Sequence, residues 1–287
     1  MASSRTRTAA VVLVALTLLA GACGGRASPN AATRPTAIVD EVVATPNGHL
    51  HLSCRGTGAT TAVLVAGFND DGRNWSSVTP SLAASTRVCW YSRFGTGDSD
   101  LPSKPQTFAS QARDLDALLR AAAEPGPYLL VGHSYGGAVA VTFASLFPTS
   151  VRGLVLIDAS PPGWDRAICA VPEDGTEAAG ELNRSCDAVA DPSRNPEHLD
   201  GPAAFAGVAA ISSLGSLPIT VLTANDHPFP GLAPGEQARL NEAWDTGQDH
   251  WTSLSSAAEL IRVEQTSHYI QLDQPAAVIQ QIRRLLP

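Results

Sequence analysis

The chain has 287 residues, of which 44% are hydrophobic and 16% charged, and its net charge is -8. This composition excludes global disorder and allows one large α/β domain with a substantial core. The acidic balance, together with the lack of any Lys/Arg cluster, argues against nucleic acid and anionic lipid headgroups as partners.

The first 22 residues have the pattern of a secretory signal peptide. Arg5 and Arg7 form a short basic region, and the apolar run over residues 9–20 is too short to span a bilayer comfortably. Small residues lead directly into Cys23, as in a bacterial lipoprotein signal, in which this cysteine becomes the lipidated first residue of the mature protein. We therefore expect a lipid anchor at Cys23 on the outer face of the cell membrane. Secretion of a free protein is the alternative if Cys23 is unmodified.

Residues 24–37 contain Gly, Pro, Ser, Asn and Thr and show no apolar periodicity. Such a composition predicts a flexible tether. The expected organisation is a signal peptide over 1–22, a lipidated cysteine and tether over 23–37, and a folded domain over 38–287.

Four cysteines remain after Cys23, an even number that favours two disulfides in an exported chain. Three pairings are possible. Position along the chain favours Cys54–Cys89, in early strand-like runs, and Cys169–Cys186, in a later irregular segment. No cysteine pair has C-x-x-C spacing, so we expect no metal site.

Strand-like and helix-like segments alternate along the folded domain. Strands are predicted, in chain order, over 49–54, 61–66, 87–92, 128–131, 151–157, 219–222 and 261–265. Helices are predicted over 75–84, with Pro80 as a defect near the middle, and over 108–123, 137–147, 254–260 and 275–286. Repeated β–α units with near-continuous apolar strands predict a mostly parallel sheet with helices on both faces. Ligands of such sheets bind beyond the C-terminal ends of the strands.

A short motif near the middle of the chain carries the main chemical signal. Residues 132–136 read Gly-His-Ser-Tyr-Gly, after a strand-like run and before a helix-compatible one. This context predicts that Ser134 is a nucleophile on a tight strand-to-helix turn. Glycine is expected at 132 and 136 because neighbouring backbone leaves no room for side chains there.

A serine hydroxyl needs a base in contact, and the base needs a carboxylate on its other nitrogen. His268 follows the last predicted strand and is the candidate base, with His227 as the alternative. Asp226, just beyond the strand over 219–222, is the preferred acid. Asp158, just beyond the strand over 151–157, is the alternative acid.

The oxyanion of a tetrahedral intermediate needs preorganised donors. The backbone N–H of Tyr135, directly after the nucleophile, is the first expected donor. The second is the backbone N–H of Phe68, in the loop that begins at Gly67 after the strand over 61–66.

Four fragments together resemble a known superfamily. They are YSRFGTGDSD over 91–100, LLVGHSYGGAVAVTFASLFP over 129–148, VRGLVLIDASPP over 151–162 and SHYIQLDQPAAV over 267–278. From about residue 40 onward the chain is similar to α/β-hydrolases of the serine-esterase and lipase-like kind. It departs from many members at Ala66, where they carry histidine, and at Ser92, where they carry aspartate.

The resemblance implies an α/β-hydrolase fold with a small cap over about 160–217, inserted before the strand that was expected to carry the acid. It also implies hydrolysis of carboxylic esters without a cofactor. We expect a small-molecule ester or lipid-like substrate and a location in the cell envelope. Hydrolysis of amide, lactone or C–C bonds, acyl transfer, and a non-catalytic binding lipoprotein are the alternatives.

Overall fold

The structure is a computed structural model that describes residues 38–225, 229 and 231–287. The predicted signal peptide, Cys23 and the tether lie outside the described residues, as do Asp226 and His227. Within the part that is described, no helix is both long and apolar enough to cross a membrane.

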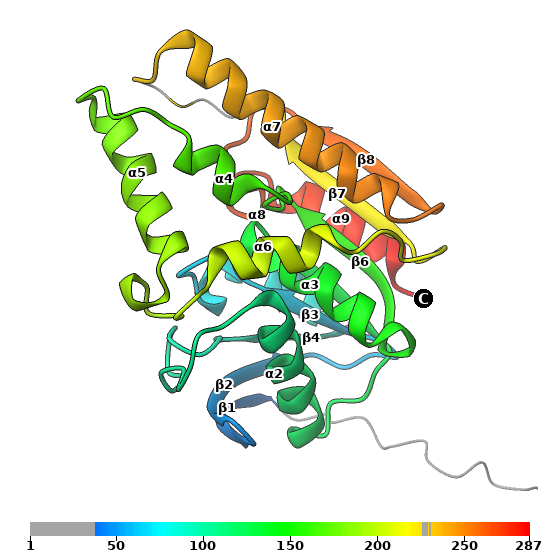
Figure 1. The fold of residues 1–287 in the computed structure, drawn as a ribbon. Coiled ribbons are helices and arrows are strands. Elements are labelled where there is room, and N and C mark those ends of the chain that lie inside the picture. The colour runs from blue at the N-terminus through cyan, green and yellow to red at the C-terminus, as the bar shows by residue number, and fades with distance from the viewer. Residues whose placement is uncertain (1–37, 226–228, 230) are drawn as a thin grey trace, which may run out of the picture. The chain divides into compact units, whose positions relative to one another are not determined.

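One eight-stranded sheet forms the centre of the domain, in the order β1-β2-β4-β3-β5-β6-β7-β8 (Figure 1). The first two pairings, β1 with β2 and β2 with β4, are antiparallel, and the remaining neighbours are parallel. This arrangement confirms the predicted mostly parallel sheet. The strands are β1 (Val39–Thr45), β2 (Gly48–Arg55), β3 (Thr61–Val65), β4 (Arg87–Tyr91), β5 (Tyr128–His133), β6 (Val151–Ile157), β7 (Ile219–Ala224) and β8 (Ala258–Val263).

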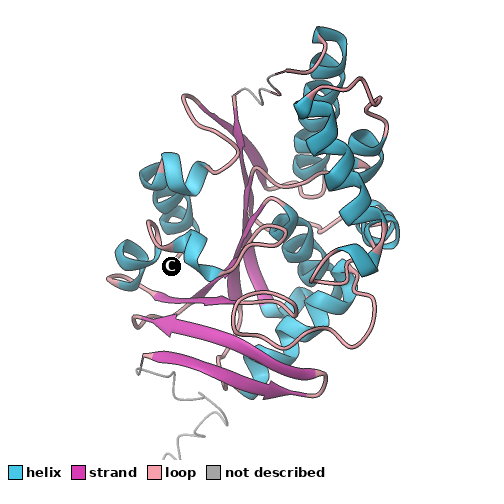
Figure 2. Ribbon diagram, turned by 90° about the vertical axis from the view of Figure 1, so that its left-hand side faces the viewer, coloured by secondary structure: helices cyan, strands magenta, loops and turns pink. Residues whose placement is uncertain are grey.

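Helices lie on both sides of the sheet (Figure 2). The α-helices are α1 (Thr79–Ala83), α2 (Phe108–Ala121), α3 (Tyr135–Leu146), α4 (Trp164–Cys169), α5 (Glu177–Ala190), α6 (Gly201–Ala209), α7 (Pro234–Ser253), α8 (Ile270–Asp273) and α9 (Pro275–Leu285). The 3-10 helices are η1 (Gly72–Trp75), η2 (Pro148–Ser150) and η3 (Pro192–Arg194).

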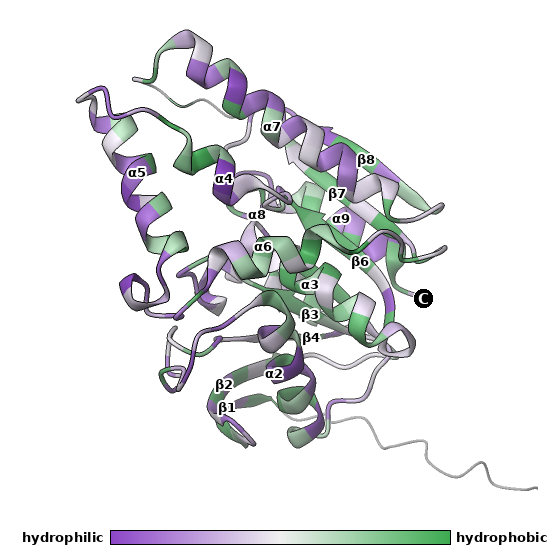
Figure 3. Cartoon of the chain, viewed as in Figure 1, coloured by the Kyte–Doolittle hydropathy of each residue, from purple (hydrophilic) through white to green (hydrophobic). Residues whose placement is uncertain are grey.

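Two apolar clusters hold the layers together, one on each face of the sheet. Leu115 of α2 and Phe143 of α3 belong to one cluster, and Leu82 of α1 and Ile282 of α9 belong to the other. Strands β3, β5 and β7 are buried along their whole length. Their continuous apolar sequences therefore reflect cover on both faces, and Figure 3 shows hydrophobic colour concentrated on the central strands and α3.

Two of the predicted helices are wrong in their extent. The segment predicted as a helix over 254–260 instead follows the end of α7 at Ser253 and enters β8, whose Ala258 pairs with Ile219 of β7. A short apolar run does not distinguish a helix from a strand, and here pairing along the edge of the sheet decides. The helix predicted over 75–84 begins only at Thr79, because Pro80 fits the first turn of α1, where its missing N–H is not needed.

The long segment between β6 and β7 contains α4, α5, η3 and α6, where the sequence had suggested irregular structure. Several of its prolines lie in the first turns of helices: Pro192 begins η3 and Pro202 lies in the first turn of α6. The Thr176 side chain caps α5 and that of Asp200 caps α6. These prolines therefore mark where helices start.

Both favoured disulfides are present. Cys54 and Cys89 are direct partners in the register between β2 and β4, so their bond joins two paired strands. Cys169 at the end of α4 is bonded to Cys186 within α5. The second bond therefore fixes two helices of the β6–β7 segment to one another.

Candidate active site

Ser134 occupies a strained turn between β5 and α3. Its backbone has φ 51° and ψ -126°, which is unusual for a residue other than glycine. Such conformations cost on the order of 1–3 kcal/mol and persist where the surrounding structure enforces them. A Cβ on Gly136 would lie 2.3 Å from the Val65 carbonyl oxygen, and one on Gly132 would lie 2.5 Å from the Gly136 carbonyl oxygen. The two glycines thus have the close backbone neighbours that the sequence predicted.

His268 lies in the loop between β8 and α8, and its ring is held by a carboxylate. Its Nδ1 is 2.7 Å from Oδ2 of Asp158, which is completely buried at the end of β6. With Nδ1 carrying the proton toward the carboxylate, Nε2 is left as the atom that accepts a proton. This is the tautomer that a general base requires.

Among the described residues, three donors hold the other oxygen of Asp158. The Thr223 hydroxyl, the Ala224 backbone N–H and the Trp244 indole N–H lie 2.9, 3.1 and 3.1 Å from Oδ1. The backbone of Asp158 has φ 44°, a second strained position at the end of a strand. A buried carboxylate with this many donors is stabilised in its charged form.

Asp226, the acid preferred on sequence grounds, lies outside the described residues, and the structure places Asp158 on His268 instead. Strands β6 and β7 are parallel neighbours, and the Asp158 backbone N–H donates to the Leu222 carbonyl at 2.6 Å. Residues that follow these two strands therefore emerge at the same edge of the sheet. Sequence position alone does not choose between them, whereas the 2.7 Å contact supports Asp158.

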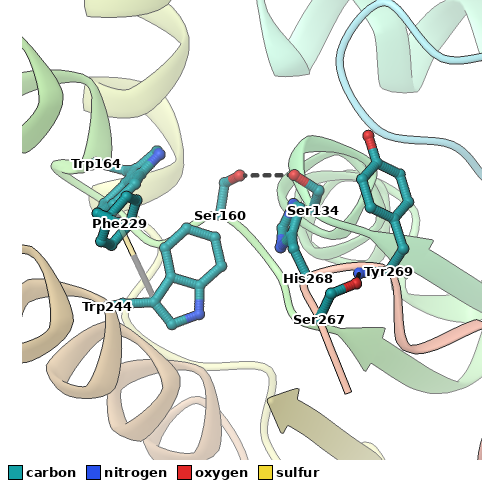
Figure 4. Close-up of a pocket in the computed structure, with 8 residues that line it drawn as sticks. All are labelled: Ser134, Ser160, Trp164, Phe229, Trp244, Ser267, His268 and Tyr269. Carbon is teal, nitrogen blue, oxygen red and sulfur yellow. Dashed lines mark hydrogen bonds between the residues drawn. The ribbon is translucent and has the colours of Figure 1, made fainter. Parts of the chain in front are cut away.

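A cavity of about 450 Å³ contains the serine and the histidine together (Figure 4). Three aromatic side chains from different parts of the chain form one wall. The described residues that line it are Ser134, Ser160, Trp164, Phe229, Trp244, Ser267, His268 and Tyr269.

The aromatic wall is ordered by ring contacts. Trp164 of α4 and Trp244 of α7 meet edge to face, with centroids 4.6 Å apart and an interplanar angle of 83°. Trp244 also stands edge-on to the His268 ring at 5.4 Å. Because Trp244 additionally donates to Asp158, its indole is oriented by the same carboxylate that orients the histidine.

Ser160 is a site residue that the sequence reading missed. Its hydroxyl oxygen lies 3.2 Å from Oγ of Ser134, and its backbone N–H donates to the Ser134 carbonyl at 3.0 Å. It comes two residues after Asp158, so the fragment Asp-Ala-Ser directly after β6 supplies both groups. That fragment was the available signal, because polar residues just beyond a parallel strand gather at the site.

The loop expected to donate to the oxyanion lies against the nucleophile. A Cβ on Gly67 would lie 3.4 Å from Cβ of Ser134. The next side chain, Phe68, packs on the Tyr135 ring with centroids 5.6 Å apart. The two residues expected to donate backbone N–H groups are therefore spatial neighbours.

His133, inside the motif, is buried behind the base. Burial, and then the nearby His268, lower the pKa of His133 to about 3. Its Nε2–H donates to the His268 backbone carbonyl at 3.0 Å, and the two rings are 4.7 Å apart. The neutral His133 side chain thus fastens the loop that carries His268 to the end of β5.

One group of side chains in the described part of the chain has spacing that would suit a metal ion: Cys54, Cys89 and Glu124. The two sulfurs are joined in a disulfide, so they are not available as thiolate ligands.

Comparison with known proteins agrees with this architecture. Residues 62–173 match the family described as the alpha/beta hydrolase fold. The uncharacterized protein YqjL of Bacillus subtilis (strain 168) is 24% identical over 224 residues, which are 78% of this chain and 82% of that protein.

Two solved structures superpose on most of the chain. Est816, described as an N-acyl homoserine lactone degrading enzyme, has a TM-score of 0.63 and 20% identity over 85% of this chain and 99% of its own. A thermophilic esterase from Thermogutta terrifontis has a TM-score of 0.59 and 23% identity over 86% of this chain and 97% of its own. The chain has the α/β-hydrolase fold, and the comparisons support a hydrolase.

Proposed function

We propose that this chain, which has the α/β-hydrolase fold, is a serine hydrolase that cleaves carboxylic esters with Ser134, His268 and Asp158 as its triad. The observation that carries the proposal is the 2.7 Å contact between His268 Nδ1 and the buried Asp158, beside a cavity that Ser134 also lines. The chain order serine, aspartate, histidine is that of α/β-hydrolases.

The proposed reaction has two halves. Ser134 Oγ attacks the ester carbonyl while His268 Nε2 takes the hydroxyl proton, and Asp158 stabilises the resulting imidazolium. The backbone N–H groups of Phe68 and Tyr135 hold the oxyanion. His268 then gives its proton to the departing alcohol, which leaves an acyl-enzyme. In the second half, water loses a proton to His268 and attacks the acyl carbon. The bond from the acyl carbon to Ser134 Oγ then breaks as His268 returns the proton to Oγ, which releases the acid and restores Ser134.

The cavity favours uncharged substrates with a ring or a branched chain. The described residues that line it include no lysine, arginine, aspartate or glutamate, and Trp164, Phe229 and Trp244 offer aromatic surface on one side. Aromatic rings pack well against an edge-to-face pair of this kind. We therefore propose neutral small-molecule esters with an aromatic or branched group as the substrate class.

We also propose that the protein acts in the cell envelope, anchored through Cys23. The two disulfides support an oxidising compartment, and the basic-then-apolar start of the chain supports export. Fractionation of cells that express the full chain tests this location. Recovery in the cytosol or as a free protein in the medium would contradict an anchor.

The decisive experiment compares wild type with Ser134→Ala on p-nitrophenyl acetate, benzoate and succinate, and with a fluorophosphonate probe. We expect the substitution to lower hydrolysis at least about 10³-fold and to abolish labelling, because it removes the hydroxyl that attacks the ester and the probe. We also expect wild type to prefer benzoate to succinate.

Ser160→Ala is the matched control, because its hydroxyl lies 3.2 Å from that of Ser134. This variant should still be labelled by the fluorophosphonate probe, whatever its rate of ester hydrolysis. Labelling that is lost in Ser160→Ala and kept in Ser134→Ala would overturn the assignment of the nucleophile. A folded wild type that neither hydrolyses an ester nor reacts with the probe would favour a binding protein.

A further inference from the structure

A buried arginine–glutamate pair contacts the loop that carries Phe68, and its carboxylate comes from the segment between β6 and β7. Arg93, two residues after β4, faces Glu197, between η3 and α6. Arg93 Nε lies 2.7 Å from Oε2 of Glu197, and a terminal guanidinium nitrogen lies 2.9 Å from Oε1. The arginine side chain is 2% exposed and the glutamate side chain is fully buried, so each depends on the other for its partner charge.

The remaining donors of Arg93 reach the loop that carries Phe68. One terminal nitrogen donates to the Ala66 carbonyl at 2.6 Å, and the other donates to the Gly67 carbonyl. Glu197 accepts the backbone N–H of Asn69 at 2.7 Å. The ion pair therefore holds the backbone immediately before and immediately after Phe68.

The same pair reaches the second expected oxyanion donor. The Arg93 guanidinium lies over the Tyr135 ring, 4.9 Å from its centroid. The Tyr135 hydroxyl donates to the Gln111 side chain at 2.7 Å, and the amide of Gln111 donates to Glu197 at 3.3 Å. One carboxylate is thus linked to both residues whose backbone N–H groups are expected to hold the oxyanion.

The segment that carries Glu197 is seated firmly on the core. Gly95 passes so close beneath it that a Cβ there would lie 2.0 Å from the Pro196 carbonyl oxygen. Gln106 and the segment exchange backbone bonds, from Gln106 N–H to the His198 carbonyl at 2.8 Å and from Asp200 N–H to the Gln106 carbonyl at 2.9 Å. The position of Glu197 is therefore set by backbone contacts as well as by its charge.

We propose that Glu197 is a positioning residue for the oxyanion hole, through which the seating of the β6–β7 segment determines how well Phe68 and Tyr135 bind the transition state. The inference rests on the proposed function. None of Arg93, Glu197, Asn69 and Gln111 lines the cavity, so binding of the substrate does not depend on their contacts. Their effect falls on the step in which the oxyanion forms.

The test is Glu197→Gln in the full chain, assayed for kcat, KM and inhibition by a trifluoromethyl ketone that mimics the tetrahedral intermediate. Losing one oxyanion donor typically costs about 10²–10³ in kcat. Glu197→Gln displaces the loop that carries Phe68 without removing the donor, so we expect a smaller effect. The substitution should lower kcat about 10–100-fold and change KM less than about threefold. The inhibition constant should rise by about the same factor as kcat/KM falls, because both report transition-state binding.

Glu124→Gln is the matched control. Glu124 forms a buried pair with Arg87. The burial of this pair matches that of the Arg93–Glu197 pair, since in both pairs the arginine side chain is 2% exposed and the glutamate side chain 0%. This variant should lose stability and keep its kcat and its inhibition constant. Equal losses of activity in the two variants would overturn the proposal, as would a folded Glu197→Gln with unchanged kcat and inhibition.

Gln111→Leu provides a milder variant in case Glu197→Gln does not fold. It removes one donor to Glu197 and the acceptor of the Tyr135 hydroxyl, and should lower kcat about 2–10-fold at constant KM. No change in kcat would overturn the proposal. An inactive wild type would instead contradict the proposed function, so the two failures are distinguishable.

Discussion

Strand β4 has a buried arginine–glutamate pair near each of its ends, and the two pairs differ in what surrounds them. Arg87, the first residue of the strand, faces Glu124, which follows α2; its Nε lies 3.3 Å from Oε2 and it also donates to the Gly56 carbonyl. Arg93, just past the other end, faces Glu197 and donates to the loop beside Ser134. The two pairs are equally buried, but the remaining hydrogen bonds of Arg87 lead to the scaffold and those of Arg93 lead to the site. A buried charge pair indicates a role in the site only when its remaining hydrogen bonds lead there.

Backbone strain in the described residues is found mostly at the C-terminal edge of the sheet. Of the six non-glycine residues with positive φ, four follow a strand at that edge, namely Asn69, Ser134, Asp158 and Gln265, while Ala123 and His198 lie elsewhere. Strain of this kind is concentrated where side chains are held for a task. Within the sheet, the Cys54–Cys89 disulfide joins two paired strands, which is a constraint on the scaffold.

The largest expected effect separates the two candidate acids, Asp158 after β6 and Asp226 after β7. Asp158→Asn should lower kcat about 10³–10⁴-fold, because the amide no longer fixes the His268 tautomer or stabilises the imidazolium. Asp226→Asn should then have only a small effect. Steady-state kinetics of both variants, with circular dichroism to show that they are folded, check the assignment. The opposite pattern would return the acid role to Asp226.

The next effect is on stability. Glu124→Gln removes the carboxylate charge that faces the buried Arg87 and should lower the free energy of unfolding by about 3–5 kcal/mol. Urea titrations measure this loss. The double variant Arg87→Met, Glu124→Leu should recover most of it, since apolar replacement of both partners is often neutral. If Glu124→Gln alone is as stable as wild type, the Arg87–Glu124 pair does not stabilise the fold.

The smallest expected effect concerns pH. His133, with its pKa lowered to about 3, stays neutral in the folded state at a pH where an unfolded histidine, with a pKa near 6.5, takes up a proton. Its contribution to stability is therefore complete above about pH 6.5 and is lost as the pH falls toward 3. Between pH 7 and pH 5, wild type should lose about 2 kcal/mol more than His133→Gln. If wild type and His133→Gln lose the same free energy of unfolding between pH 7 and pH 5, His133 makes no such contribution to stability.

Much of this fold was readable from the sequence because its signals are local. The glycines around Ser134 and the apolar runs of β3, β5 and β6 predict the elbow and the parallel sheet directly. The disulfide pairing followed from positions along the chain. Three features of the site are not determined by local sequence: the role of Asp158, the proximity of Ser160 to Ser134, and the pairing of Arg93 with Glu197. Each depends on which strand ends meet, or on a contact between residues more than a hundred positions apart.

The two tryptophans of the cavity wall differ in how freely they can change during divergence. Trp244 both faces the cavity and donates to Asp158, so a substitution that reshapes the wall there also alters the environment of the acid. Trp164 contributes to the same wall from α4 and lies in the segment between β6 and β7. Substitutions that change the substrate range should therefore arise at position 164 before they arise at position 244. Of the two tryptophans, Trp164 is the one to vary first in laboratory evolution of new ester preferences.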